Sequence, residues 1–412
     1  MEITSPEALG FSAQRLSRLT PRMQAYVDAG TCAGISTLVA RRGEVVHFGQ
    51  VGFQDREAGV PLGPDTLFRI YSMTKPVVCT ALMTLFEEGR FQLTDPVARY
   101  LPAFAKVRVL RRTEGGDRLE DLTRPITVRD LMTHTSGLTY GFLDDSPVGA
   151  LYRESGFLGD AGRTLERAMA DLAELPLAFQ PGTRWHYSVG IDLAAHLIER
   201  LTDQPLGDAL RERLFAPLGM DETGFSVAEG ARGRVAAMYG SPDIMTASLP
   251  EIFRAALGGF NQRLDVEANY PVDRPETFAR GGHGLFSTMG DYFRFAQMLL
   301  SGGELGGVRI LAPKTAQLMH LTHLPEALRP YEIGGLPAYG YGFGLGSRVL
   351  LDVAASGLPG SVGEFGWSGA AKTYYWVDPQ EELVGLFMAQ YMVGLELPER
   401  TFQILTYQAL LD

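Results

Sequence analysis

The chain has 412 residues, of which 45 % are apolar and 21 % charged, as in ordinary globular proteins with a sizeable core. Its formal net charge of −11, with no clustered Lys/Arg excess, argues against a nucleic-acid-binding surface. No stretch approaches the ~18 apolar residues of a membrane span, and the N-terminal residues carry no apolar signal segment. Cys32 and Cys79 have no metal-binding spacing. These features predict a cytoplasmic protein.

Apolar positions at helical spacing predict a first helix over residues 11–29, followed by an antiparallel hairpin that turns at Arg42–Gly43. Glycine stops and helical periodicity predict further helices over residues 75–89, 127–138, 164–174, 190–202 and 290–301. Strand patterns return late, in residues 339–351, 371–379 and 381–393. A last helix is predicted over residues 397–411.

Strands near both termini and helices between them predict an α+β fold. Residues 1–90 and 330–412 would build an antiparallel sheet flanked by helices, and residues 91–329 would form a largely helical domain partly packed on that sheet. No internal repeat or flexible linker separates the two parts. We therefore expect the chemistry in the cleft between them.

The segment "FRIYSMTKPVV" places Ser72 three residues before Lys75, one of only four lysines, at the start of an apolar helix. Side chains at i and i+3 of a helix lie about 5–6 Å apart at Cβ, so the hydroxyl and the amine can share a proton. An activated serine nucleophile needs such a neighbour. The simpler interpretation is a helix cap beside an ordinary lysine, since S-x-x-K is a short motif.

Two further segments favour the nucleophile. "PGTRWHYSVG" places Tyr187 just before a helix, and "GEFGWSGAAKTYYWVDP" places Trp367–Ser368–Gly369 at the start of a late strand. With "ITVRDLMTHTSGL" and "GGHGLFSTMGDYFRFAQMLL", this ordered set resembles the class C β-lactamase superfamily of penicillin-recognising serine hydrolases, and within it the family VIII carboxylesterases. The resemblance runs from about residue 8 to about residue 405.

The resemblance implies a β-lactamase-like fold and a serine hydrolase without metal or cofactor. It makes Ser72 the nucleophile that forms an acyl-enzyme, with Lys75 and Tyr187 moving protons; which of these two is the base stays open, because they titrate as a pair. It also implies an oxyanion hole formed by the backbone N–H groups of Ser72 and Ala370.

The chain departs from the class C pattern at two positions. These enzymes usually carry asparagine two residues after the tyrosine and Lys-Thr-Gly on the strand, whereas this chain has Val189 and the triplet Trp367–Ser368–Gly369. Both changes weaken recognition of a β-lactam carboxylate and amide. They predict a carboxylesterase for short- to medium-chain esters, with Val189 and the triplet in contact with a small uncharged substrate.

Several alternatives stay open. A β-lactamase, a D-amino-acid peptidase or an acyltransferase would use the same residues, and a binding or scaffold protein could keep the fold without turnover. Lys372 is interpreted as an ordinary strand residue and His134 as structural. His320 and His323 stand three residues apart without a third metal ligand, so we expect them at the surface. The sequence does not indicate the oligomeric state.

Overall fold

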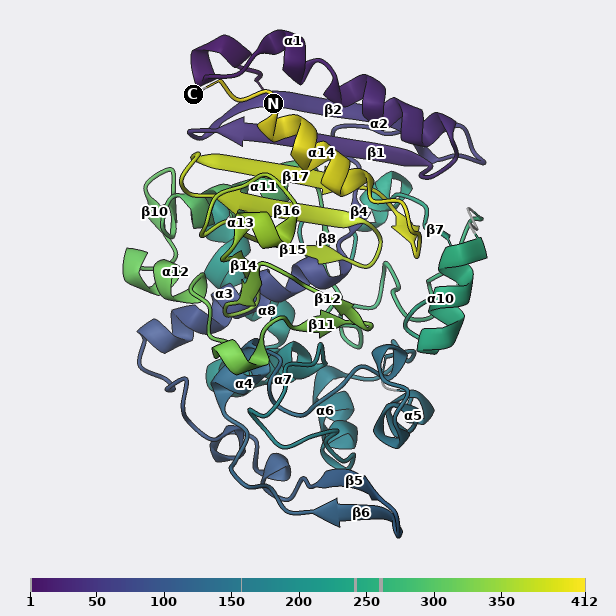
Figure 1. Ribbon diagram of the computed structural model, residues 1–412, viewed down its shortest axis with the longest axis vertical. Coiled ribbons are helices and arrows are strands. Elements are labelled where there is room, and N and C mark those ends of the chain that lie inside the picture. Colours follow the sequence, from purple (N-terminus) through teal and green to yellow (C-terminus); the bar gives the residue numbers. More distant parts are fainter. Residues whose placement is uncertain (1, 157, 241–242, 259–261, 412) are drawn as a thin grey trace.

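A computed structural model describes residues 2–156, 158–240, 243–258 and 262–411. Its centre is an eight-stranded antiparallel sheet (Figure 1). The strands follow in the spatial order β13 (Tyr341–Phe343), β14 (Arg348–Leu350), β15 (Phe365–Gly369), β16 (Thr373–Asp378), β17 (Leu383–Met388), β1 (Gly34–Arg41), β2 (Glu44–Asp55) and β3 (Val60–Pro61). The first and last parts of the chain thus meet where β1 pairs with β17.

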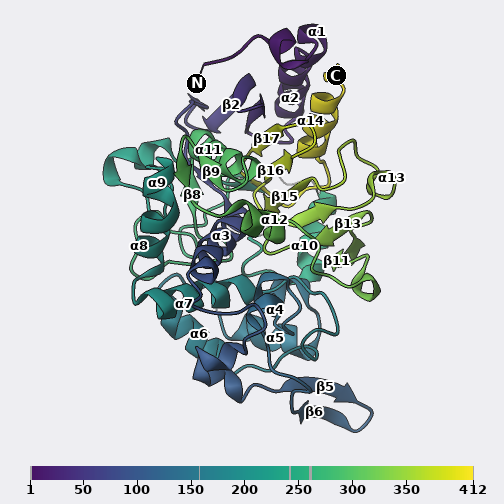
Figure 2. The same cartoon turned by 90° about the vertical axis from the view of Figure 1, so that its left-hand side faces the viewer.

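Alternate side chains of the central strands enter two different cores, as the two-residue period of a strand requires. On one face, Tyr374 and Trp376 of β16 join the core with α2 (Leu19–Asp28) and α14 (Pro398–Tyr407). On the other face, Tyr375 and Val377 join the core that contains α3 (Thr74–Glu87) and α11 (Met289–Leu300). Figures 1 and 2 show α2 and α14 side by side on the outer face.

The segment between the two halves of the sheet is mainly helical, and its residues 128–156 and 158–202 lie on the side of α3 away from the sheet (Figure 2). Its helices are α4 (Val128–Met132), α5 (Pro147–Glu154), α6 (Leu165–Ala173), α7 (Gly190–Thr202), α8 (Leu206–Leu210), α9 (Ala216–Leu218), α10 (Leu249–Gly258) and α12 (Pro313–Met319). The hairpin of β5 (Val109–Thr113) and β6 (Gly116–Glu120) projects at its outer end (Figures 1 and 2). None of the described helices is long and apolar enough to cross a bilayer.

Short elements complete the fold. They are α1 (Ala13–Leu16), α13 (Val353–Ser356) and the pairs β4 (Phe68–Arg69) with β8 (Phe286–Ser287), β7 (Tyr239–Gly240) with β18 (Tyr391–Met392), β9 (Glu304–Leu305) with β10 (Val308–Arg309), and β11 (Glu332–Ile333) with β12 (Leu336–Pro337).

Three local predictions were wrong. The helix predicted over 11–29 is two helices, because Ser12 caps α1 and the chain leaves helical pairing at Ser17 before α2 begins. The helix predicted over 127–138 ends at Met132, since His134 takes a left-handed backbone with φ 56°. The triplet Trp367–Ser368–Gly369 ends its strand rather than starting it, because β15 begins at Phe365 and turns at Ala370.

Candidate active site

Ser72 lies in a short 3₁₀ turn, η2 (Tyr71–Met73), directly before α3. Its predecessor Tyr71 is fully buried, has a left-handed φ of 43° and packs its ring 4.9 Å from that of Tyr270. A bulky residue in that region is strained by about 1–3 kcal/mol and needs tertiary support. The packing of Tyr71 therefore fixes the direction in which the chain presents Ser72.

Hydrogen bonds from three separate segments hold this turn. The Ile70 N–H donates to the Leu285 carbonyl at 3.0 Å, the Tyr292 hydroxyl donates to the Met73 carbonyl at 2.9 Å, and the Thr373 hydroxyl donates to the Ile70 carbonyl at 3.1 Å. The turn is thus fastened to both the sheet and α11.

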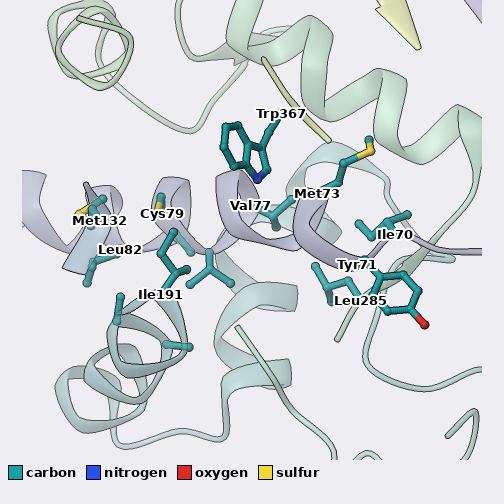
Figure 3. Close-up of a cluster of buried hydrophobic side chains, with 14 of the residues drawn as sticks. Ile70, Tyr71, Met73, Val77, Cys79, Leu82, Met132, Ile191, Leu285 and Trp367 are labelled. Atoms are coloured by element: carbon teal, nitrogen blue, oxygen red, sulfur yellow. The ribbon is translucent and has the colours of Figure 1, made fainter. Parts of the chain in front are cut away.

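Apolar side chains anchor α3 itself. Figure 3 shows Val77 and Leu82 of α3 in a buried cluster that includes Ile191 from α7 and Trp367 from β15. The helix that follows Ser72 is therefore embedded between the sheet and the helical part of the chain.

Lys75 is fully buried, and its amine contacts the hydroxyl of Ser72. Nζ donates to Ser72 Oγ at 3.1 Å and to the Gly282 carbonyl at 2.7 Å. Within the described residues no carboxylate forms a direct ion pair with Lys75. This is not the environment of a solvated surface lysine, and the geometry allows a proton to pass between Ser72 and Lys75.

Tyr187 reaches the same point from the loop before α7. Its ring centroid lies 4.6 Å from Lys75 Nζ, and its hydroxyl accepts a hydrogen bond from Trp367 Nε1 at 3.2 Å. This donor fixes the direction of the phenol hydroxyl beside Lys75. The structure therefore brings Lys75 into contact with Ser72 on one side and with the ring of Tyr187 on the other.

The end of β15 lies against the turn that holds Ser72. A Cβ on Gly369 would stand 2.3 Å from the Ile70 carbonyl oxygen, so only glycine allows this approach. Among the described residues, no carbonyl accepts the N–H of the following Ala370, which is half-exposed in the turn to β16. Ser368 is exposed beside it. The predicted oxyanion donors, Ser72 and Ala370, thus lie on two segments in direct contact.

Two predicted substrate contacts are buried in different ways. Trp367 is 4 % exposed and points its indole N–H at Tyr187. Val189 precedes α7 and has no exposed surface, so it lies beneath the site instead of facing substrate. Val189 therefore has no accessible surface for the predicted substrate contact.

The other polar candidates are all hydrogen-bonded or paired. His134 Nδ1 contacts Ser188 Oγ at 3.1 Å, and burial holds the pKa of His134 well below its ordinary value. Lys372 pairs with Glu399 at 3.8 Å. His320 was expected at the surface but is half-buried, stacked 3.5 Å from the ring of Phe365, with Nδ1 on the Ala316 carbonyl.

Sequence reasoning missed one buried group of the site, Asp192 on α7. It is fully buried, and its Oδ1 accepts the Gly282 N–H at 3.0 Å. Burial raises the pKa of Asp192, while the positive charge of Lys75 lowers it. The available signal was an aspartate inside the otherwise apolar run Ile191–Ala195.

Comparisons with known proteins show what the chain as a whole is similar to. A family model described as Beta-lactamase matches residues 19–408. Protein Rv1367c of Mycobacterium tuberculosis is 39 % identical over 375 residues, which cover 90 % of this chain and 88 % of that protein. Esterase EstB of Burkholderia gladioli is 32 % identical and covers 92 % of both chains. The solved structure of EstCE1, described as a hydrolase with promiscuous acyltransferase activity, superposes with a TM-score of 0.77 at 27 % identity, covering 97 % of this chain and 99 % of that chain.

Proposed function

Because the chain belongs to the beta-lactamase family, as an ester-hydrolysing serine hydrolase, we propose that it is a carboxylesterase that cleaves short- to medium-chain esters through an acyl-enzyme on Ser72. The observation that carries the proposal is the convergence on Lys75: its amine contacts Ser72 Oγ and lies over the ring of Tyr187. Similarity to Esterase EstB supports the same reaction class.

In the proposed mechanism, Ser72 Oγ attacks the ester carbonyl carbon while its proton passes to the Lys75–Tyr187 pair. The carbonyl oxygen becomes negative and is held by the N–H groups of Ser72 and Ala370, a contribution of about 10²–10³ in rate per donor. The C–O bond to the alcohol then breaks, and the alcohol leaves with the proton that the pair had accepted. Water repeats these steps on the acyl-enzyme and releases the acid.

The charges around the site favour an uncharged substrate. Arg69, three residues before the nucleophile, is paired with Glu267, and Lys372, two residues after Ala370, is paired with Glu399. Trp367 occupies the triplet position where class C enzymes carry a cation, and it donates to Tyr187. A substrate carboxylate would therefore find no ready counter-charge on these segments.

Acyl transfer is the second candidate. The description of EstCE1 as a hydrolase with promiscuous acyltransferase activity favours it. Transfer differs from hydrolysis only in the last step, where an alcohol replaces water on the acyl-enzyme. Product analysis with butanol as a competing acceptor separates the two, since butyl ester accumulates only if transfer occurs.

The test is a rate comparison of wild type and Ser72→Ala on p-nitrophenyl butyrate and on a chromogenic cephalosporin. The proposal predicts fast ester cleavage and little cephalosporin turnover, with both lost in the variant. A preference for the cephalosporin would make the chain a β-lactamase. Full ester turnover by Ser72→Ala would remove Ser72 from the mechanism, and no turnover by wild type would favour a binding protein.

A further inference from the structure

We propose that Asp192 is a positioning residue that holds Lys75 in place and supplies the buried negative charge that faces its amine. This inference rests on the proposed function, because it assigns a role in activating Ser72. No feature of the S-x-x-K motif, the tyrosine or the late-strand triplet points to this residue.

A two-step chain of hydrogen bonds joins the carboxylate to the lysine. Asp192 Oδ1 accepts the Gly282 N–H at 3.0 Å, and the carbonyl of the same residue accepts Lys75 Nζ at 2.7 Å. Gly282 therefore connects the Asp192 carboxylate to the Lys75 amine, so that the position of one constrains the position of the other. The same amine also donates to Ser72 Oγ at 3.1 Å, so the series of hydrogen bonds ends at the proposed nucleophile.

The glycines of the segment Arg280–Gly284 permit this arrangement. A Cβ on Gly282 would lie 2.4 Å from Asp192 Oδ2 and 2.7 Å from the Tyr140 hydroxyl. A Cβ on Gly281 would lie 2.5 Å from Cβ of Ala195 on α7. All three distances are shorter than real Cβ contacts, so the segment lies directly on α7 only because these residues are glycine.

The buried carboxylate of Asp192 has few hydrogen bonds to offset the loss of its hydration. It is fully buried, and within the described residues Oδ2 has no hydrogen-bond partner. A buried carboxylate with a free oxygen is costly unless a positive charge stands near. Lys75 is a positive charge that can offset this cost.

The charged and titratable groups that face Asp192 come from three segments besides α7. They are Lys75 on α3, Tyr140 before α5, and Arg280 on the glycine segment. The Arg280 guanidinium donates to the carbonyls of Thr277, Asp160 and Arg163. Lys75 is thus the cation of this group that also contacts the nucleophile.

The consequence concerns the resting state of the site. An ionised Asp192 places a negative charge near the Lys75–Tyr187 pair that has to accept the proton of Ser72. A nearby negative charge makes any proton on such a pair harder to remove. Removing the charge while keeping the shape should let the pair lose its proton more easily. The acidic limb of the pH profile should then move toward lower pH.

The experiment compares kcat/KM for p-nitrophenyl butyrate between pH 5 and pH 9 in wild type and Asp192→Asn. Asparagine keeps an oxygen for the Gly282 N–H and removes the charge. We expect the acidic limb to move down by about one pH unit, as loss of a neighbouring opposite charge generally does. A role in packing alone would lower kcat/KM at every pH without moving the limb.

Asp291→Asn is the matched control, because Asp291 is also buried and accepts hydrogen bonds from the Glu222 N–H and Thr223 on a segment away from Lys75. Its profile should superpose on that of wild type. If Asp192→Asn does not fold, Asp192→Ser removes the same charge and carries the same test. An acidic limb that does not move in a folded Asp192 variant overturns the inference. The same result is expected if Asp192 is already protonated in wild type, and it overturns the inference in that case too. The proposed function still stands if Ser72→Ala is inactive.

Discussion

Glu364, at the edge of β15, should make the stability of the protein depend on pH. Its carboxyl is 1 % exposed, accepts hydrogen bonds from Gln403 Nε2 at 2.9 Å and the Tyr407 hydroxyl at 3.1 Å, and lies 3.7 Å from Arg348. Burial, only partly offset by Arg348, raises the pKa of Glu364 from 4.5 to about 7. The folded protein therefore holds this proton to a higher pH than the unfolded chain does.

The sign and size follow from linkage. Stability from the protonated carboxyl is fully present below pH 4.5, where both states are neutral, and is lost as the pH rises to 7. A change of pKa from 4.5 to about 7 corresponds to about 3 kcal/mol. Glutamine cannot ionise, so Glu364→Gln lacks this loss of stability, whereas wild type undergoes it between pH 5 and pH 8. The difference in unfolding free energy, variant minus wild type, should therefore rise by about 2–3 kcal/mol over that range.

The assay is urea unfolding followed by tryptophan fluorescence at both pH values. Glu382→Gln is the control, because Glu382 is exposed and its pair with Arg42 is solvated, which makes a pH-independent difference the expected result. If the difference in unfolding free energy between Glu364→Gln and wild type stays constant or falls as the pH rises, the raised pKa assigned to the buried carboxyl of Glu364 is refuted.

Three substitutions test the support of the site. Trp367→Phe removes the donor to the Tyr187 hydroxyl. The loss of one hydrogen bond predicts a roughly two- to tenfold lower kcat at unchanged KM. An unchanged kcat would show that this hydrogen bond does not contribute to catalysis. Thr373→Val removes the hydroxyl on the Ile70 carbonyl and should lower kcat by a similar factor, which Thr373→Ser should restore; equal rates in all three proteins would contradict the role given to that contact. Gly369→Ala places a methyl group 2.3 Å from the same carbonyl oxygen, so both melting temperature and kcat should fall, and a fully active variant would mean that the strand end moves freely.

The sequence predicts the parts of the site that are local in the chain. Ser72 and Lys75 are three residues apart at a helix start, and this spacing alone brings their side chains into contact. The α+β class also follows from local patterns, because strand periodicity at both ends of the chain leaves few other ways to bury the apolar faces.

Contacts between distant segments could not be predicted in this way. The hydrogen bond from Trp367 to Tyr187 joins residues 180 positions apart. The position of Asp192 depends on how closely Gly282 approaches α7, which is a property of packing and not of helical spacing. Val189 looks like a substrate contact in the linear order, yet the start of α7 turns it into the core.

Local irregularities explain the helix that was predicted too long and the hairpin of β5 and β6, for which no strands were predicted. The left-handed backbone of His134 ends α4 five residues after it starts, although the residues that follow have helical spacing. The hairpin of β5 and β6 is polar on both faces, with four of the five residues in β6 exposed, so its sequence resembles a solvated loop. The polar hairpin leaves no hydrophobic period to detect, whereas the helical period around His134 continues past the point where the helix ends.

The central claim is that Ser72 is the residue acylated by substrate. The most direct measurement is to quench wild type and Ser72→Ala with acid during turnover of p-nitrophenyl butyrate and to map the peptides by mass spectrometry. The account predicts one butyryl group on the peptide that contains Ser72 in wild type and none in the variant. A butyryl group on another residue, or an active wild type that never carries one, would contradict it.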